Sequence, residues 1–360
     1  MTQPRPGLVE TPEITLEELQ LATRNHGMPL EALRWPVTPL GLHYLLIHFD
    51  IPAVDVSSWS LEVGGAVERP LRLSLEELRA RPARSVTITM ECAGNGRARL
   101  EPRPLSQPWL VEAVGTARWT GVPLRSLLDE VGLQPGTVDV VFTGADHGVD
   151  GGVDQDYERS LPVDEASRDD VLLAYAVNDE PLPPQHGAPL RLVVPGWYGM
   201  TNVKWLARVT AITEPFAGYQ NAQGYRFKQD ADDPGEPVTR MHPRALMVPP
   251  GVPDFMTRHR FVERGEVPIT GRAWSGLGSI AEVEVSADWG ATWHAATLGP
   301  PPDKFAWCGW SWTWTPPGPG DYELWCRSRD VTGAEQPLDA PWNLKGYANT
   351  AVQRVPVTVR

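Results

Sequence analysis

The chain has 360 residues, of which 41% are hydrophobic and 21% charged, so it is long enough for two globular domains with separate cores. Its net charge of −13 at pH 7 argues against a nucleic-acid partner or a membrane-surface partner. An anionic substrate would therefore need a locally basic pocket. The 37 prolines and 33 glycines predict short elements joined by many turns.

The first 40 residues form a polar extension with a helical stretch at 15–25. The sequence contains no apolar core of a signal peptide, no twin arginine and no run of about 18 apolar residues. We therefore expect a cytoplasmic protein with no membrane segment, or a periplasmic one if an export signal has been removed.

Residues 41–240 alternate short strands with short helices. Strands are predicted at 59–67, 85–92, 137–146 and 189–199. One helix begins after Ser74, where Glu77 completes a capping box, and another follows residue 122 and stops at Gly132. The absence of a regular βαβ rhythm favours the α+β class over a doubly wound α/β sheet.

Residues 230–253 are rich in proline and acidic residues, which is typical of a linker. Alternating strands separated by turns follow at 267–276, 280–298, 310–330 and 351–360. They predict an immunoglobulin-like β-sandwich over residues 241–360. Cys308 and Cys326 could form a pair, but buried core thiols are favoured because the three cysteines contain no CxxC motif.

Cys92 stands between a predicted strand and the glycine-rich turn "AGNGR". A cysteine at a strand end projects from the sheet edge, and the backbone N–H groups of the turn together with Arg97 would favour its thiolate. A thiolate can attack a substrate or bind a soft metal. Position alone favours an ordinary core thiol, so the case for chemistry depends on the surrounding sequence.

That surrounding sequence, "MECAGNGR", closely resembles the molybdenum-binding segment of the sulfite oxidase family. Residues 113–128 and 172–209 are similar to later segments of the same family, as are "ITGRAWSG", "VEVSADWGATW" and "PWNLKGYANTAVQRV". The resemblance covers most of residues 40–360. It implies an α+β molybdenum-cofactor domain over 41–240, followed by an immunoglobulin-like dimerisation domain over 241–360 and hence a homodimer.

The resemblance also implies a cofactor site, in which molybdenum is bound by Cys92 and by the dithiolene of one molybdopterin. The pterin contacts that it implies are Tyr44, His48, Asp146, His186, Arg191, Asn202 and Lys204. Considered alone, His186 would be a loop histidine and Lys204 a charge in a strand. No CxxCH motif occurs and no upstream segment could hold a haem domain, so we expect no haem and an external electron acceptor such as a cytochrome.

The substrate pocket that the resemblance implies contains Arg97, Trp109, Tyr225 and Lys345. Lys345 stands where sulfite-oxidising members of the family carry arginine. Lysine keeps the positive charge but lacks the planar fork that binds an oxyanion through two hydrogen bonds.

A second departure lies at Leu46 and Ile47, which replace an arginine and an asparagine of the family's "RNH" motif, while His48 is retained. Another "RNH" occurs at residues 24–26. It is either a chance match or part of a loop that folds back to supply Arg24 to the pocket.

The leading hypothesis is the oxidation of sulfite to sulfate by oxygen-atom transfer at the metal. Arg97 and Lys345 would bind the anion, with Arg24 as a third candidate, and Tyr225 would position it or move a proton. The alternatives are reduction of nitrate or of an S-oxide with the same cofactor, and a binding protein that keeps the fold without turnover.

Overall fold

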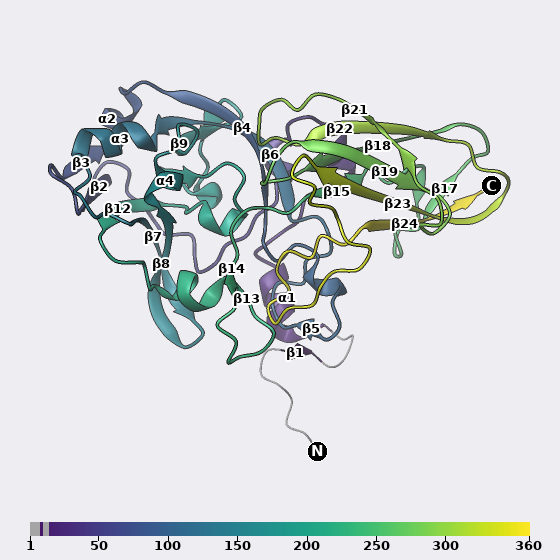
Figure 1. Ribbon diagram of the computed structural model, residues 1–360, viewed down its shortest axis with the longest axis horizontal. Helices are drawn as coiled ribbons and strands as arrows, with labels where there is room; N and C mark the ends of the chain where they lie inside the picture. The colour runs from purple at the N-terminus through teal and green to yellow at the C-terminus, as the bar shows by residue number, and fades with distance from the viewer. Residues whose placement is uncertain (1–7, 10–13) are drawn as a thin grey trace, which may run out of the picture.

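The computed structural model describes residues 8–9 and 14–360 and has two lobes that lie side by side (Figure 1). The remaining residues of the predicted N-terminal extension, 1–7 and 10–13, lie outside the described residues. The N-terminal lobe contains two five-stranded sheets, and the C-terminal lobe contains a four-stranded and a six-stranded sheet. No helix in the described part of the chain has the length and apolar character needed to span a membrane.

The first sheet of the N-terminal lobe carries the cysteine turn at one of its ends. β4 (Arg84–Glu91) pairs antiparallel with β6 (Val114–Pro123) along its whole length. The sheet has the order β10-β9-β6-β4, with β11 also paired to β9. Its other strands are β9 (Leu172–Val177), β10 (Glu180–Pro181) and β11 (Arg191–Val193).

The second sheet of this lobe has the order β3-β2-β12-β7-β8 and mixes parallel with antiparallel pairs. Its strands are β2 (Ser60–Gly65), β3 (Leu71–Ser74), β7 (Asp139–Asp150), β8 (Val153–Pro162) and β12 (Leu206–Ile212). A buried core of aliphatic and aromatic side chains, with contributions from both sheets and from α3, lies in this lobe.

The helices are few and short, as the composition predicts. α2 (Leu75–Arg79) has the predicted capping box between Ser74 and Glu77, and α3 (Leu124–Val131) ends at Gly132, whose φ is +68°. α4 (Val163–Ala166) follows β8. α1 (Leu16–Ala22) docks near β5 (Arg103–Pro104) through a buried ion pair between Glu18 and Arg103, and β5 also pairs with β1 (Leu8–Val9).

The C-terminal lobe is a β-sandwich whose two sheets share one core. The four-stranded sheet contains β15 (Arg244–Met247), β18 (Val267–Trp274), β21 (Thr297–Leu298) and β22 (Cys308–Trp314). The six-stranded sheet contains β16 (Val252–Pro253), β17 (Arg260–Val262), β19 (Ile280–Ser286), β20 (His294–Ala295), β23 (Gly320–Asp330) and β24 (Gln353–Val359). Cys308 and Cys326 are free thiols buried in this core. The α+β class and the sandwich are thus confirmed, while the exact boundaries at residues 40 and 240 stay predictions.

Glu91, the last residue of β4, ties the two lobes together. Its Oε1 accepts a hydrogen bond from Arg244 Nη1 at 2.5 Å, and its Oε2 accepts one from Trp274 Nε1 at 2.9 Å. The side chains of Glu91 and Arg244 are each 1% exposed. Because Glu91 directly precedes Cys92, the sandwich fixes the end of the strand that carries the cysteine.

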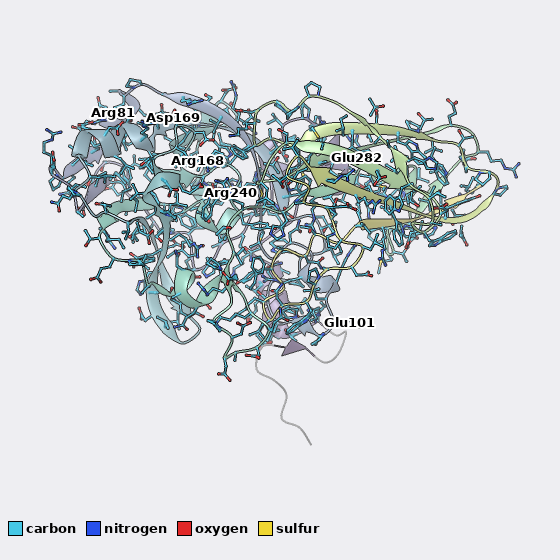
Figure 2. The ribbon with its side chains drawn as sticks, in the orientation of Figure 1. Arg81, Glu101, Arg168, Asp169, Arg240 and Glu282 are labelled. Carbon is cyan, nitrogen blue, oxygen red and sulfur yellow. The ribbon has the colours of Figure 1, made fainter. Side chains whose placement is uncertain are left out.

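A second polar contact anchors the segment that leads into the sandwich, which includes β13 (Arg226–Phe227) and β14 (Glu236–Pro237). Glu165 of α4 pairs with Arg168 at 2.8 Å and also with Arg240. Figure 2 labels the two arginines. One carboxylate thus joins a cation of the first lobe to a cation of the connecting segment.

Candidate functional site

The turn after β4 holds Cys92 in a fixed position. The backbone N–H of Cys92 donates to Ala113 O at 2.9 Å. Asn95 closes the turn, since its Nδ2 donates to Glu91 Oε1 at 3.0 Å and its Oδ1 accepts from the backbone N–H of Ala113 at 3.0 Å. Gly96 has a φ of +95°, which turns the chain sharply before Arg97.

Burial is the largest influence on the pKa of the Cys92 thiol, because this residue is only 8% exposed. Desolvation raises the pKa of the thiol, although Arg97 and the backbone N–H of Gly94 act in the opposite direction. Arg97 and the turn thus favour the thiolate, as expected, but burial outweighs them and raises the pKa of the thiol overall. Coordination to a metal ion would deprotonate the thiol regardless of this shift.

A first cavity beside Cys92 brings together all eight residues that were predicted to contact the metal or the pterin. They are Tyr44, His48, Cys92, Asp146, His186, Arg191, Asn202 and Lys204. These residues come from the segment after residue 40, the turn after β4, β7, β11 and the loops on both sides of β11. The fold thus joins segments that lie far apart in the sequence into one wall.

Buried polar atoms in this first cavity fit a polar cofactor. His43 Nε2, Asp146 Oδ1 and Arg191 Nε belong to residues that line it, and none has a hydrogen-bond partner within the described residues. An unsatisfied buried polar group costs about 1–3 kcal/mol, so such groups are expected to bind a ligand. In this wall the backbone of Gly199 lies close to the Tyr44 hydroxyl, because a Cβ added at Gly199 would lie 2.2 Å from Tyr44 Oη. The donors and acceptors present match those that a pterin and its phosphate require.

Desolvation shifts the pKa values of the charged groups around the first cavity. It lowers the pKa of Lys204 to about 7 and that of Arg191 to about 10. Burial, followed by the nearby His43, lowers the pKa of His186 to about 2. Burial also raises the pKa of Asp146 to about 6. A bound phosphate would restore the charged forms of the two cations, because an opposite charge nearby favours ionisation.

His43 was missed from the sequence. It is 2% exposed, and its ring centroid lies 5.6 Å from that of His186 in an edge-on arrangement. The imidazole of His43 packs directly against Gly115, since a Cβ added at Gly115 would lie 2.6 Å from the ring. The sequence feature that could have indicated a role for His43 is its position directly before Tyr44, a predicted pterin contact.

Stability should depend on pH through His43, because burial lowers the pKa of its imidazole to about 4. The unfolded chain, with a pKa near 6.5, binds this proton while the folded chain does not, so the contribution of His43 to stability is complete above about pH 6.5. It falls by about 1.4 kcal/mol per pH unit between about pH 6.5 and pH 4. Urea unfolding at pH 6.5 and 5.5 should therefore show a shallower pH dependence in His43→Gln.

The control for this prediction is His147→Gln. His147 is an exposed histidine whose pKa is raised by its hydrogen bond to Asp156. Its removal should change the pH slope in the opposite direction or leave it unchanged. Identical slopes in the wild type and His43→Gln would contradict the prediction.

A second cavity of about 370 Å³ opens beside Cys92 and contains five of the six predicted catalytic residues, namely Cys92, Arg97, Trp109, Tyr225 and Lys345. Arg97 is 7% exposed, and its guanidinium donates to the hydroxyl of Ser106 and lies 5.4 Å from the ring centroid of Tyr347. Lys345 is exposed. This second cavity therefore has a fixed cation near the cysteine and a solvated one at its edge.

The sixth predicted residue, Arg24, is exposed and lines neither cavity. The loop that carries it does fold back, because His26 pairs with Leu45 through two backbone hydrogen bonds. Asn25 is the residue that points inward. Its Oδ1 accepts from the backbone N–H of Ile47 at 2.7 Å, and its Nδ2 donates to Gln107 Oε1 at 3.1 Å. The loop thus supports the wall of the second cavity without adding a cation to it.

Asp150 is a second residue that was missed, and it places a carboxylate in the second cavity. His48 Nε2 lies 3.3 Å from Asp150 Oδ2, which also accepts a hydrogen bond from Gln220 Nε2 at 3.2 Å. The contact with His48 lowers the pKa of Asp150, and Lys345 contributes to the same shift. The only signal in the sequence was the Gly-Gly turn that follows Asp150 in the β7–β8 hairpin.

Known proteins share both the sequence and the fold. Residues 48–220 match the oxidoreductase molybdopterin binding domain, and residues 241–360 match the Mo-co oxidoreductase dimerisation domain. The chain is 37% identical over 336 residues to sulfite oxidase from Gallus gallus, covering 88% of this chain and 72% of that protein. It is 31% identical over 357 residues to an NADH nitrate reductase from Solanum lycopersicum, covering 90% of this chain but only 38% of that protein.

Among solved structures, the sulfane dehydrogenase SoxCD from Paracoccus pantotrophus superimposes with a TM-score of 0.79 at 28% identity, covering 91% of this chain and 82% of that one. The relatives, the two matched domains and the residues of the cavity beside Cys92 all indicate the same family. The chain belongs to the family of molybdopterin-dependent oxidoreductases that includes sulfite oxidase and nitrate reductase.

Proposed function

We propose that this enzyme oxidises sulfite to sulfate and passes the two electrons to an external acceptor such as a cytochrome. The observation that supports this most directly is that Arg97 and Lys345 line the same cavity as Cys92. Two cations in one cavity with the predicted metal ligand suit a small oxyanion. When bound, the molybdenum cofactor supplies the oxygen atom that the sulfur gains and takes up the electron pair.

The other residues of the second cavity orient the anion. Burial holds the pKa of Tyr225 well above its usual range, so the hydroxyl stays protonated and donates a hydrogen bond. The ring of Tyr225 is stacked on Tyr347 with centroids 5.2 Å apart, which fixes its direction. Trp109 is 5% exposed, and its indole faces Cys92 and lowers the pKa of that thiol, so its N–H lies where it could donate to an oxygen of a substrate bound there.

A homodimer formed through residues 241–360 and a cytoplasmic location are part of this proposal. The matched dimerisation domain over those residues supports the homodimer. Light scattering on the purified protein should give twice the mass of one chain.

The test of the activity is turnover by purified, molybdenum-loaded protein. Sulfite with ferricyanide and nitrate with a reduced viologen would be measured side by side, together with metal content. About one molybdenum per chain with sulfite turnover would support the proposal. Turnover of nitrate alone would assign a reductase, and a protein that takes up no molybdenum would contradict the proposal.

Arg97→Gln is expected to lower kcat/KM for sulfite by roughly 10- to 100-fold, because a hydrogen bond to a charged group contributes about 1.5–3 kcal/mol. The matched control is Arg99→Gln. Arg99 lies in the same short 3-10 turn (Arg97–Arg99) but lines neither of the two cavities beside Cys92. Equal losses in the two variants would show that Arg97 acts only through the structure of the turn.

A further inference from the structure

The second cavity is larger than sulfite requires. Its volume is about 370 Å³, whereas one water molecule takes up about 30 Å³ of the liquid and sulfite has only four heavy atoms. Cavities of a few hundred Å³ are typical of sites for small organic molecules. A cavity of this size could hold a substituent on the sulfur in addition to the oxyanion group.

The lining of the second cavity includes apolar side chains as well as its cations and polar groups. Leu46 lines both cavities, as Cys92 does, so an aliphatic side chain stands beside the metal ligand. Further apolar residues of the same wall are Leu21, Ile47, Phe49, Leu105 and Leu344. Leu105 is 38% exposed, so part of this apolar surface is open to a ligand. A hydrated ion gains nothing from such a wall, whereas a hydrocarbon group does.

The charge of the second cavity suits a monoanion. Arg97 and Lys345 contribute two positive charges, and Asp150 contributes one negative charge. Asp150 stays ionised because His48, Gln220 and Lys345 all stabilise its carboxylate. These three side chains together carry one positive charge. Sulfite is partly a dianion at neutral pH, and the Asp150 carboxylate opposes its second negative charge.

From this size, wall and charge we propose that the preferred substrate is an organic sulfinate with an apolar substituent, which the enzyme oxidises to the sulfonate. The inference rests on the proposed oxidation at sulfur and names the substrate class for that site. The sulfinate group would bind Arg97 and Lys345 near Cys92, and its substituent would lie along Leu46 and the neighbouring apolar wall.

The reaction balances as RSO₂⁻ plus water giving RSO₃⁻, two protons and two electrons. One S–O bond forms through the sulfur lone pair, and the carbon–sulfur bond stays intact. Sulfur is oxidised, and a one-electron acceptor, a cytochrome or ferricyanide, is reduced twice. The added oxygen derives from water.

The test compares benzenesulfinate with sulfite on the same molybdenum-loaded preparation with ferricyanide. Burying a phenyl group contributes about 1.5–3 kcal/mol, so kcat/KM should be roughly 10- to 100-fold higher for benzenesulfinate. Mass spectrometry should identify benzenesulfonate as the product. Sulfite turnover with an equal or lower kcat/KM for benzenesulfinate would overturn this inference and leave the proposed function standing.

Leu46→Arg provides a second measurement, since it adds a charge and fills part of the apolar wall. It should reverse the preference in favour of sulfite by at least about 10-fold, while Leu338→Arg, a half-exposed residue outside both cavities beside Cys92, should keep it. An unchanged preference in Leu46→Arg would contradict the proposed wall.

Binding by calorimetry decides the inference without turnover. Benzenesulfonate should bind the loaded wild-type protein roughly tenfold more tightly than sulfate does. Equal affinities would overturn the substrate class, and absence of turnover with either substrate would overturn oxidation at sulfur itself.

Discussion

Replacing Arg244 with leucine is expected to lower the free energy of unfolding by about 3–5 kcal/mol, the usual loss when one partner of a buried ion pair is removed. The substitution would leave the Glu91 carboxylate, which is 1% exposed, with Trp274 and Asn95 as its remaining side-chain partners. Arg244 also donates to the backbone oxygen of Asn349, so a bond within the C-terminal lobe would be lost as well. Urea unfolding of the loaded protein would measure the loss.

The matched control is Arg258→Leu. Arg258 pairs with Glu31 of the N-terminal extension, but its side chain is 54% exposed and Glu31 keeps Arg260 as a second partner, so its loss should cost at most about 1 kcal/mol. Because Glu91 precedes Cys92, Arg244→Leu should also lower the molybdenum content, whereas Arg258→Leu should not. Similar losses of stability in the two variants would contradict the role given to the buried pair.

Glu91 depends on Arg244, a partner far away in the sequence, and contacts of this kind explain much of what could not be predicted from the sequence. Local signals sufficed for the capping box of α2, for the stop of α3 at Gly132 and for β4, since each depends on neighbours along the chain. The strand predicted at 189–199 is shorter in the structure, where β11 covers Arg191–Val193. It ends there because the backbone N–H of Val194 donates to the side chain of Asn202 at 2.7 Å, which replaces a strand partner.

The same distinction between local signals and long-range contacts applies to the candidate site. Resemblance placed eight residues on the first cavity, because they lie within recognisable motifs. His43 and Asp150 escaped notice since their roles come from contacts with His186 and His48, far away in the sequence. The motif "RNH" at residues 24–26 could not show which side chain of the loop points inward. The structure shows that it is Asn25.

Cys92→Ser is expected to lower both bound molybdenum and sulfite turnover by more than about 100-fold, because the loss of mere outer-shell partners already costs 10- to 100-fold in metal sites. A serine hydroxyl is a harder and less acidic ligand than a thiol, so it replaces the thiolate poorly. Metal analysis and the ferricyanide assay on the same preparation would measure the two effects.

The matched control is Cys308→Ser in the core of the sandwich. Cys308 is as buried as Cys92, at 6% and 8% exposure respectively, but it lines none of the cavities beside β4. Its substitution should leave the molybdenum content unchanged even if stability falls, because Cys92 lines both cavities and Cys308 lines neither. If Cys92→Ser kept its molybdenum but lost turnover, the pterin residues alone would hold the metal, and the thiol would serve the reaction and not the binding.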